Sequence, residues 1–282
     1  MTAASQAMRP VRNPRDRQHH SPLVRWYRRN ERLILGLVGI AGFLGFWEFG
    51  ARAGLVDTFF FSQPTAIAAA AVNEVQLPRF WGDVQASVFE FLVGFLLAIV
   101  TAVPLGIIFG WYRRLSYMAN PWLNLFNSLP RIALLPLLVL WVGLGVESKI
   151  AVVFLGAFFS IIIPTVQGVR TVDRRFLDVA QSFGASQGRL FRSVVAPATV
   201  PFIATGLRLG LGRALIGVVV GELYAQTTGL GVIIIKASNN IQPDRMFFAI
   251  FIFTFAGVVG VQALRRVEHY FDRWRPSLEE QP

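Results

Sequence analysis

Six long apolar stretches restrict what this chain can fold into. They lie at residues 33–52, 86–110, 121–145, 149–168, 198–222 and 246–264. Each is long enough to cross a hydrocarbon layer of about 30 Å as an α-helix. The 282 residues are 54% hydrophobic and 15% charged, whereas soluble domains average about 45–50% apolar and about 25% charged residues. The sequence therefore predicts an all-α membrane protein with six transmembrane helices.

Arginine residues gather in alternate segments between these stretches. The segments that carry most of them are 1–32, 111–120, 169–197 and 265–275. The opposite segments carry Arg52, Arg79, Lys149, Lys236 and Arg245, offset by carboxylates. Because short cytoplasmic loops are rich in basic residues, both termini are expected in the cytoplasm. The net charge of +11 is then explained by membrane topology, and no nucleic-acid partner is expected.

Composition also limits the chemistry of the chain. There is no cysteine and there are three histidines, all near the termini, so we expect no metal site and no catalytic residues. Residues 1–32 are predicted to be a disordered basic cytoplasmic tail, residues 33–276 a transmembrane domain, and residues 277–282 a C-terminal tail. No internal repeat or second soluble domain is apparent.

The polar loop at about residues 169–197 is too long to be a simple connector. Residues 177–183 and 186–195 are both compatible with short helices, and Gly184 between them gives the backbone freedom for a bend. Pro197 marks the entry to the fifth span. Phe183, Leu190 and Phe191 are candidate apolar anchors for a soluble partner. The alternative is an amphipathic connector that lies at the membrane surface without a partner.

The spacing within this loop resembles the loop that permeases of the ATP-binding-cassette (ABC) class present to their ATPase. That pattern is Glu-Ala-Ala, three residues, Gly, nine residues, then Ile-x-Leu-Pro. Ala180, Gly184 and Pro197 match it, and four positions depart from it: Asp178, Val179, Val194 and Ala196. The resemblance implies an ATPase-coupling role for Asp178, Ala180, Phe183, Gly184, Ala185, Leu190, Phe191 and Pro197.

The likeness extends from about residue 40 to 276. The matching stretches are Phe46-Trp-Glu48, Phe61-Ser-Gln-Pro64, Val103-Pro-Leu-Gly106, Leu129-Pro-Arg-Ile-Ala-Leu-Leu-Pro136, Trp141-Val-Gly143, Gly206-Leu-Arg-Leu-Gly-Leu-Gly212 and Val220-Gly-Glu222. With them the chain resembles the permease subunits of the nitrate/sulfonate/taurine family of ABC importers. Glu90 is a departure, since a basic residue is expected near it in relatives.

The resemblance implies a type I importer permease fold in the bacterial cytoplasmic (inner) membrane, with a coupling-helix loop. It also implies ABC ATPase subunits, a second permease copy forming a homodimer, and an extracytoplasmic substrate-binding protein. Membrane lipid surrounds such a chain. The sequence has no P-loop motif, so ATP and Mg²⁺ would bind the partner ATPase, and this chain would have no cofactor and no enzymatic activity of its own.

The substrate implied by the resemblance is a small anion: an aliphatic sulfonate, taurine or nitrate. Bicarbonate or a pyrimidine vitamin precursor is the alternative within the same importer class. An ion-coupled secondary transporter is a different class. It predicts paired intramembrane carboxylates and inverted repeats, whereas the intramembrane carboxylates here are isolated.

The fifth apolar stretch combines small residues and charges. Gly206, Gly210, Ala214, Gly217 and Gly221 fall within a stripe of about 80° on a helix, which predicts close helix packing with an unidentified partner helix. Charges at this depth cost about 2.5–3.5 kcal/mol each, so they should face protein or water. Arg208, Arg213 and Glu222 are therefore candidate residues of a translocation pathway. Alternatively, the arginines bond helix-end carbonyls or a carboxylate such as Glu48 or Glu90.

Overall fold

The computed structural model describes residues 22–271, and every regular element in that range is helical. The chain divides into two compact units, and the boundary between them in the sequence falls between Val56 and Asp57. Within residues 22–271, five helices are long and apolar enough to cross a membrane, and a bent pair supplies a sixth candidate span. This confirms the predicted class, an all-α membrane protein.

The first unit consists mainly of α1, Pro22–Arg52. Apolar side chains such as Leu33 and Phe46 are exposed along it, which is typical of a helix that faces lipid. Residues 22–32 are helical here, although the sequence predicted a disordered tail for them. The rest of that predicted tail, 1–21, lies outside the described residues. So does the predicted boundary at residue 276.

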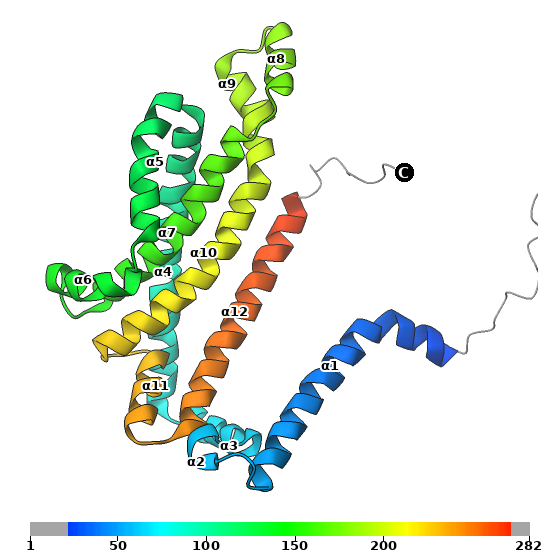
Figure 1. The fold of residues 1–282 in the computed structure, drawn as a ribbon, viewed down its shortest axis with the longest axis vertical. Coiled ribbons are helices and arrows are strands. Elements are labelled where there is room, and N and C mark those ends of the chain that lie inside the picture. The colour runs from blue at the N-terminus through cyan, green and yellow to red at the C-terminus, as the bar shows by residue number, and fades with distance from the viewer. Residues whose placement is uncertain (1–21, 272–282) are drawn as a thin grey trace, which may run out of the picture. The chain divides into compact units, whose positions relative to one another are not determined.

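The core of the second unit is a layer of three long helices: α4 (Pro78–Trp111), α7 (Val146–Arg170) and α10 (Ala196–Ala225). They lie side by side in Figure 1, with α7 packed against both of the others. Val153 on α7 illustrates this position, because Gly94 of α4 and Gly217 of α10 both lie against it. The buried core here consists mostly of alanine and β-branched side chains.

Glycines allow these helices to approach closely. On α4, a methyl group added at Gly94, Gly106 or Gly110 would overlap Val153, Thr165 or Val169 of α7. On α10, the stripe Gly206, Gly210, Ala214, Gly217 and Gly221 is buried. Its glycines lie against Ile161, Val153 and Lys149 of α7. The helix that this stripe meets, which the sequence left open, is therefore α7.

We expect Gly217→Ala to destabilise this packing. The added methyl carbon would lie 2.9 Å from the Cα atom of Val153, and backbone cannot move aside as a flexible side chain can. Overpacking of this kind costs about 1–3 kcal/mol. Gly212→Ala is the matched control, because nothing lies within 4 Å of its added methyl and alanine favours a helix by about 0.5–1 kcal/mol over glycine. Unfolding in increasing SDS would measure both; equal stability of the two variants would contradict the packing argument.

The third predicted span, 121–145, is not one straight helix. The structure breaks it into α5 (Arg113–Ser128), a 3₁₀ turn η2 (Arg131–Leu134) and α6 (Leu135–Val142). The two parts are bent by 87°. Leu129 precedes Pro130 and has an extended backbone, because proline disfavours the helical conformation of the residue before it. The hydropathy of residues 121–145 predicted a membrane segment here but did not indicate the break between α5 and α6.

Shorter helices cover one end of the core, which we call the α11 end. They are α2 (Thr58–Phe61), α3 (Pro64–Val75) and α11 (Leu230–Asn239). The long helix α12, Pro243–Phe271, starts at this end. It is tied to α3 by an ion pair of 2.5 Å between Arg245 Nη2 and Glu74 Oε1. Two of the charges expected outside the membrane are therefore paired with each other.

Candidate functional site

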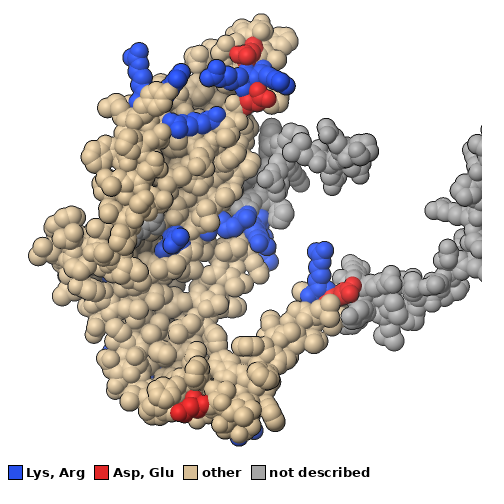
Figure 2. All heavy atoms as spheres, in the orientation of Figure 1, with Lys and Arg blue, Asp and Glu red and all other residues tan. Residues whose placement is uncertain are grey.

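The segment between α7 and α10 forms the opposite end, which we call the α8–α9 end. It contains α8 (Arg174–Ser182), α9 (Gln187–Leu190) and a π-helical segment, Phe191–Val195. Asp173 caps α8 by accepting a 2.9 Å hydrogen bond from the N–H of Arg175. Figure 2 shows basic side chains, which are arginines, gathered at this end of the second unit. They come from the α4–α5 junction, the end of α7, and the segment 174–192.

Gly184 terminates α8 through a Schellman motif. Its φ is +73°, a left-handed conformation that glycine adopts without strain. The N–H of Gly184 donates to the carbonyl of Gln181 at 2.8 Å, and the N–H of Ala185 donates to the carbonyl of Ala180 at 3.0 Å. These two bonds are those of the motif. Ala180, Gly184 and Ala185 therefore set the angle between the two parts of the loop.

One face of α8 is apolar and exposed. Phe176, Val179 and Phe183 are 66%, 56% and 86% exposed, and their spacing places them on the same side of the helix. Asp178 is also exposed, on another side of the helix. Sequence reasoning selected Phe183 but did not include Phe176, because it started the helix at residue 177, and it treated Val179 only as a departure from the family pattern. The N-cap residue Asp173 was the signal that could have extended the predicted helix.

The other two predicted anchors face inward. Leu190 is 2% exposed, and Phe191 makes an edge contact with Trp111, with ring centroids 5.6 Å apart. Both hold the loop against the core; Leu190 is not available to a partner in this conformation, whereas Phe191 is half-buried and also lines a cavity. Pro197 follows the π-helical segment and lies in the first turn of α10. Its missing N–H interrupts the hydrogen-bond pattern of the continuous helical run 187–225 at this point.

A cavity of about 380 Å³ lies beside the break between α5 and α6. Its polar lining includes Asn127, Ser160 and Arg213, and Pro130 contributes the broken backbone. Among the described residues, none forms a hydrogen bond or ion pair with the side chain of Arg213. The cavity therefore presents an uncompensated positive charge within the helical layer, which suits an anion.

The other two charged candidates lie elsewhere on α10. Arg208 precedes Arg213 by five residues, which rotates it by about 140° on the helix, and it does not line this cavity. Glu222 is fully buried. It accepts hydrogen bonds from Ser87 Oγ at 2.5 Å and from the N–H of Gly231 at 2.6 Å. The structure thus separates the three residues that the sequence grouped as a pathway.

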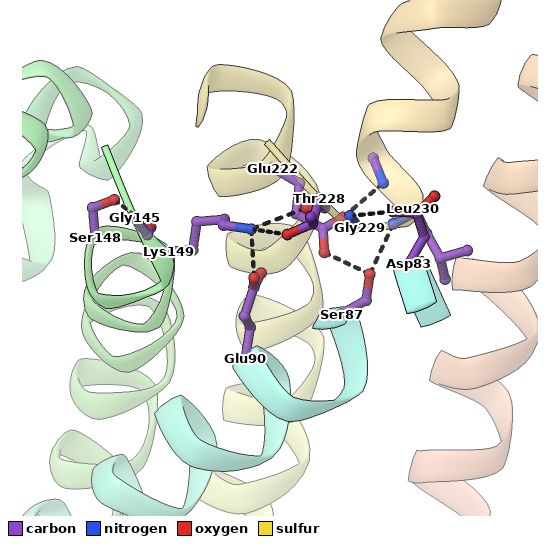
Figure 3. Close-up of polar contacts among 11 residues, drawn as sticks. Asp83, Ser87, Glu90, Gly145, Ser148, Lys149, Glu222, Thr228, Gly229 and Leu230 are labelled. Atoms are coloured by element: carbon purple, nitrogen blue, oxygen red, sulfur yellow. Dashed lines mark hydrogen bonds and ion pairs between the residues drawn. The ribbon is translucent and has the colours of Figure 1, made fainter. Parts of the chain in front are cut away.

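Glu222 belongs to a group that we call the polar cluster: Asp83, Ser87 and Glu90 of α4, Lys149 of α7, Glu222 of α10, and the turn 228–231. Figure 3 shows these side chains pointing toward one another from the three helices. Lys149 Nζ lies 2.5 Å from Glu90 Oε1, with the two side chains 1% and 0% exposed. Sequence reasoning counted Lys149 among the basic residues on the side opposite the arginine-rich segments and considered Glu90 as a partner for an arginine, so it missed this pair.

The polar cluster also fixes the turn that leads into α11. Lys149 Nζ donates to the carbonyl of Thr228 at 2.9 Å. The N–H groups of Gly229 and Leu230 donate to Asp83 Oδ1 at 3.0 Å and to Ser87 Oγ at 2.9 Å. Gly229 has a φ of +121°, and an added methyl would overlap the Glu222 carboxylate. The cluster therefore joins α4, α7, α10 and α11 at one end of the core.

Comparison with known proteins identifies the class to which this arrangement belongs. Residues 102–275 match the family described as the binding-protein-dependent transport system inner membrane component. The chain belongs to this family, the permeases of ABC importers. This confirms the resemblance inferred from the motifs and the type I importer permease fold.

Individual relatives match most of their own length. A probable ABC transporter permease protein of Brucella abortus (strain 2308) is 32% identical over 86% of this chain and 96% of its own. The putative aliphatic sulfonates transport permease protein SsuC of Bacillus subtilis (strain 168) is 31% identical over 86% of this chain and 88% of its own. The formylaminopyrimidine transport permease protein ThiX of Halalkalibacterium halodurans is 29% identical over 81% and 91%. Relatives of similar identity are thus named for chemically different substrates.

Proposed function

We propose that this chain is the permease subunit of an ATP-driven importer that carries a small anion, a sulfonate such as taurine or an inorganic anion such as nitrate. The observation that carries the anion is Arg213, whose charge lines a cavity within the helical layer and has no bonding partner among the described residues. Bicarbonate would suit the same charge, whereas a neutral pyrimidine precursor would not need it.

The proposed energy source is a separate ATPase that binds the α8–α9 end from the cytoplasm. Support comes from the exposed apolar face of α8, which is surrounded by arginines. Buried aromatic anchors with a polar rim are typical of strong protein interfaces. ATP and Mg²⁺ would bind that partner. Two permease copies would enclose the pathway, and an extracytoplasmic binding protein would deliver substrate at the α11 end. Both termini would then be cytoplasmic, in the bacterial inner membrane.

In this proposal the break at Pro130 is part of the pathway. The backbone of residues 129–132 leaves the helical hydrogen-bond pattern, and irregular backbone at membrane depth is tolerated where it lines a cavity. Asn127 and Ser160 would supply polar contacts to the anion beside Arg213. The predicted roles of Arg208 and Glu222 in the translocation pathway remain predictions. Neither residue lines this cavity.

We expect Arg213→Gln to reduce anion import at least tenfold, because it removes the charge from the cavity while keeping a polar side chain. Cells expressing the complete importer would be supplied with labelled sulfonate, taurine, nitrate or bicarbonate, and uptake would be measured. Arg213→Lys should retain more import than Arg213→Gln, because it keeps the charge. A loss of about 1.4 kcal/mol of attraction between this residue and the anion corresponds to a roughly tenfold lower affinity.

Two results would contradict the anion assignment. One is unchanged import of the transported anion by Arg213→Gln. The other is specific import of a neutral pyrimidine that Arg213→Gln does not alter. In either case the chain remains an importer permease, and only its substrate class would need revision. Arg208→Gln, tested in parallel, shows whether the second arginine contributes to import.

A further inference from the structure

A second cavity, of about 900 Å³, lies where the end of α4 meets α9 and the π-helical segment. Its volume is within the range of about 300–1,000 Å³ that small-molecule sites occupy. The residues that line it come from 107–112 and from 186–193. None of the exposed apolar side chains of α8 lines it, so it is distinct from the apolar face of α8 proposed to bind an ATPase, although both lie at the α8–α9 end.

The lining of this cavity changes from apolar to cationic. Ile107 and Ile108 lie one turn before the end of α4, and Trp111 and Tyr112 lie at the end itself. On the loop side the lining residues are polar apart from Gly188 and Phe191, and they include Arg189 and Arg192. Tryptophan and tyrosine are typical of the boundary between hydrocarbon and headgroups. The order of side chains therefore follows the order of groups in an amphiphile: chain, glycerol region and charged head.

The charge of the cavity lining indicates which kind of headgroup would fit. No Asp or Glu lines the cavity. Among the described residues, no carboxylate is paired with Arg189 or Arg192. Two guanidinium groups can hold a phosphate through charge-assisted hydrogen bonds. The hydroxyl groups of Ser186 and Ser193, which also line the cavity, could add neutral hydrogen bonds to the remaining phosphate or glycerol oxygens.

We propose that this cavity binds an anionic phospholipid. Its phosphate diester would lie between Arg189 and Arg192, and an acyl chain would follow Ile107 and Ile108 along α4. The apolar part of the lining favours a lipid over a soluble phosphate, which would leave those isoleucines in contact with water. Such a lipid would brace the loop against α4 at the position where Phe191 contacts Trp111. This goes beyond the proposed transport function and does not depend on the transported substrate.

Trp111 gives a site-specific test. The full-length chain would be placed in nanodiscs of phosphatidylcholine and titrated with phosphatidylglycerol that carries brominated chains, which quench tryptophan fluorescence on contact. We expect quenching by phosphatidylglycerol to exceed quenching by brominated phosphatidylcholine. The excess should disappear in Trp111→Phe. The variant Arg189→Gln/Arg192→Gln should bind phosphatidylglycerol about 25-fold more weakly, from about fivefold for each basic residue near an anionic lipid.

The matched control is Arg174→Gln/Arg175→Gln. It removes the same charge from the same segment, but from exposed positions on α8 outside the cavity. It should leave the affinity for phosphatidylglycerol unchanged. Equal quenching by the two brominated lipids would overturn the proposal, as would equal losses in the two double variants. Effective competition by soluble glycerophosphoglycerol would show that the site takes the headgroup alone and would overturn the assignment to lipid.

Discussion

Lys149→Met is expected to destabilise the protein by about 3–5 kcal/mol, the effect of leaving a buried charge without its partner. Glu90 is fully buried and its Oε1 atom lies 2.5 Å from Lys149 Nζ. Its Oε2 atom has no hydrogen-bond partner among the described residues. The lysine also holds the carbonyl of Thr228 at 2.9 Å. Loss of the ammonium group therefore removes two contacts at once. Unfolding in SDS and the yield of monodisperse protein would both report the change.

A second variant separates lost charge pairing from general damage. Glu90→Gln/Lys149→Met removes both charges with little change of side-chain size, and should recover most of the lost stability, since neutral replacements of buried pairs are often tolerated. Lys236→Met is the control, because Lys236 is the only other lysine in the chain and is exposed. If the double variant were as unstable as Lys149→Met, the loss would not arise from an unpaired Glu90.

Phe183→Ala and Phe176→Ala are expected to weaken binding of the ATPase by about thirtyfold each, if these residues are anchors worth about 2 kcal/mol. Both side chains are more than half exposed, so the fold of the permease should survive their removal. The measurement is titration of the ATPase subunit onto the permease in nanodiscs, followed by ATP-dependent uptake in cells. Uptake should fall with affinity, whereas the amount of permease in the membrane should not.

Phe255→Ala provides the comparison for these variants. Phe255 lies on α12 and is 70% exposed, so the same change of side chain is made away from the loop. It should leave ATPase binding unaltered. Normal ATPase binding by the Phe183→Ala/Phe176→Ala double variant would contradict the coupling role of α8. Equal loss in Phe255→Ala would point to a general effect of the membrane region.

Much of the fold could be predicted because hydropathy and arginine placement act over whole helices. The first, second, fourth, fifth and sixth predicted spans all lie within long helices of the structure. The third fails at Pro130, where a single residue changes the backbone of its neighbour Leu129. An average over twenty residues cannot detect such a local effect. The motif Leu129-Pro-Arg-Ile contained the signal, because a proline can kink a membrane helix, but the sequence does not give the size of the bend.

The candidate sites were less predictable because they depend on which helices meet. The periodicity of α10 defined its glycine stripe, yet the partner helix α7 came only from the structure. Glu90 and Lys149 are 59 residues apart in the chain, and nothing local to either residue indicates that they pair. Leu190 and Phe183 are both apolar residues of one loop, but only packing shows that Leu190 is 2% exposed and Phe183 86% exposed.

The position of α7 between two sets of glycine contacts has a mechanical consequence. Because its neighbours interlock with its backbone on both sides, sliding of α4 or α10 past it would require several overlaps to be relieved together. We therefore expect α4, α7 and α10 to tilt together as one rigid unit. Helix α10 has 30 residues and is about 45 Å long at 1.5 Å per residue. A displacement of α8 would therefore be transmitted along α10 to the polar cluster. Bending would instead occur at Pro130, in the break between α5 and α6, which would act as the hinge.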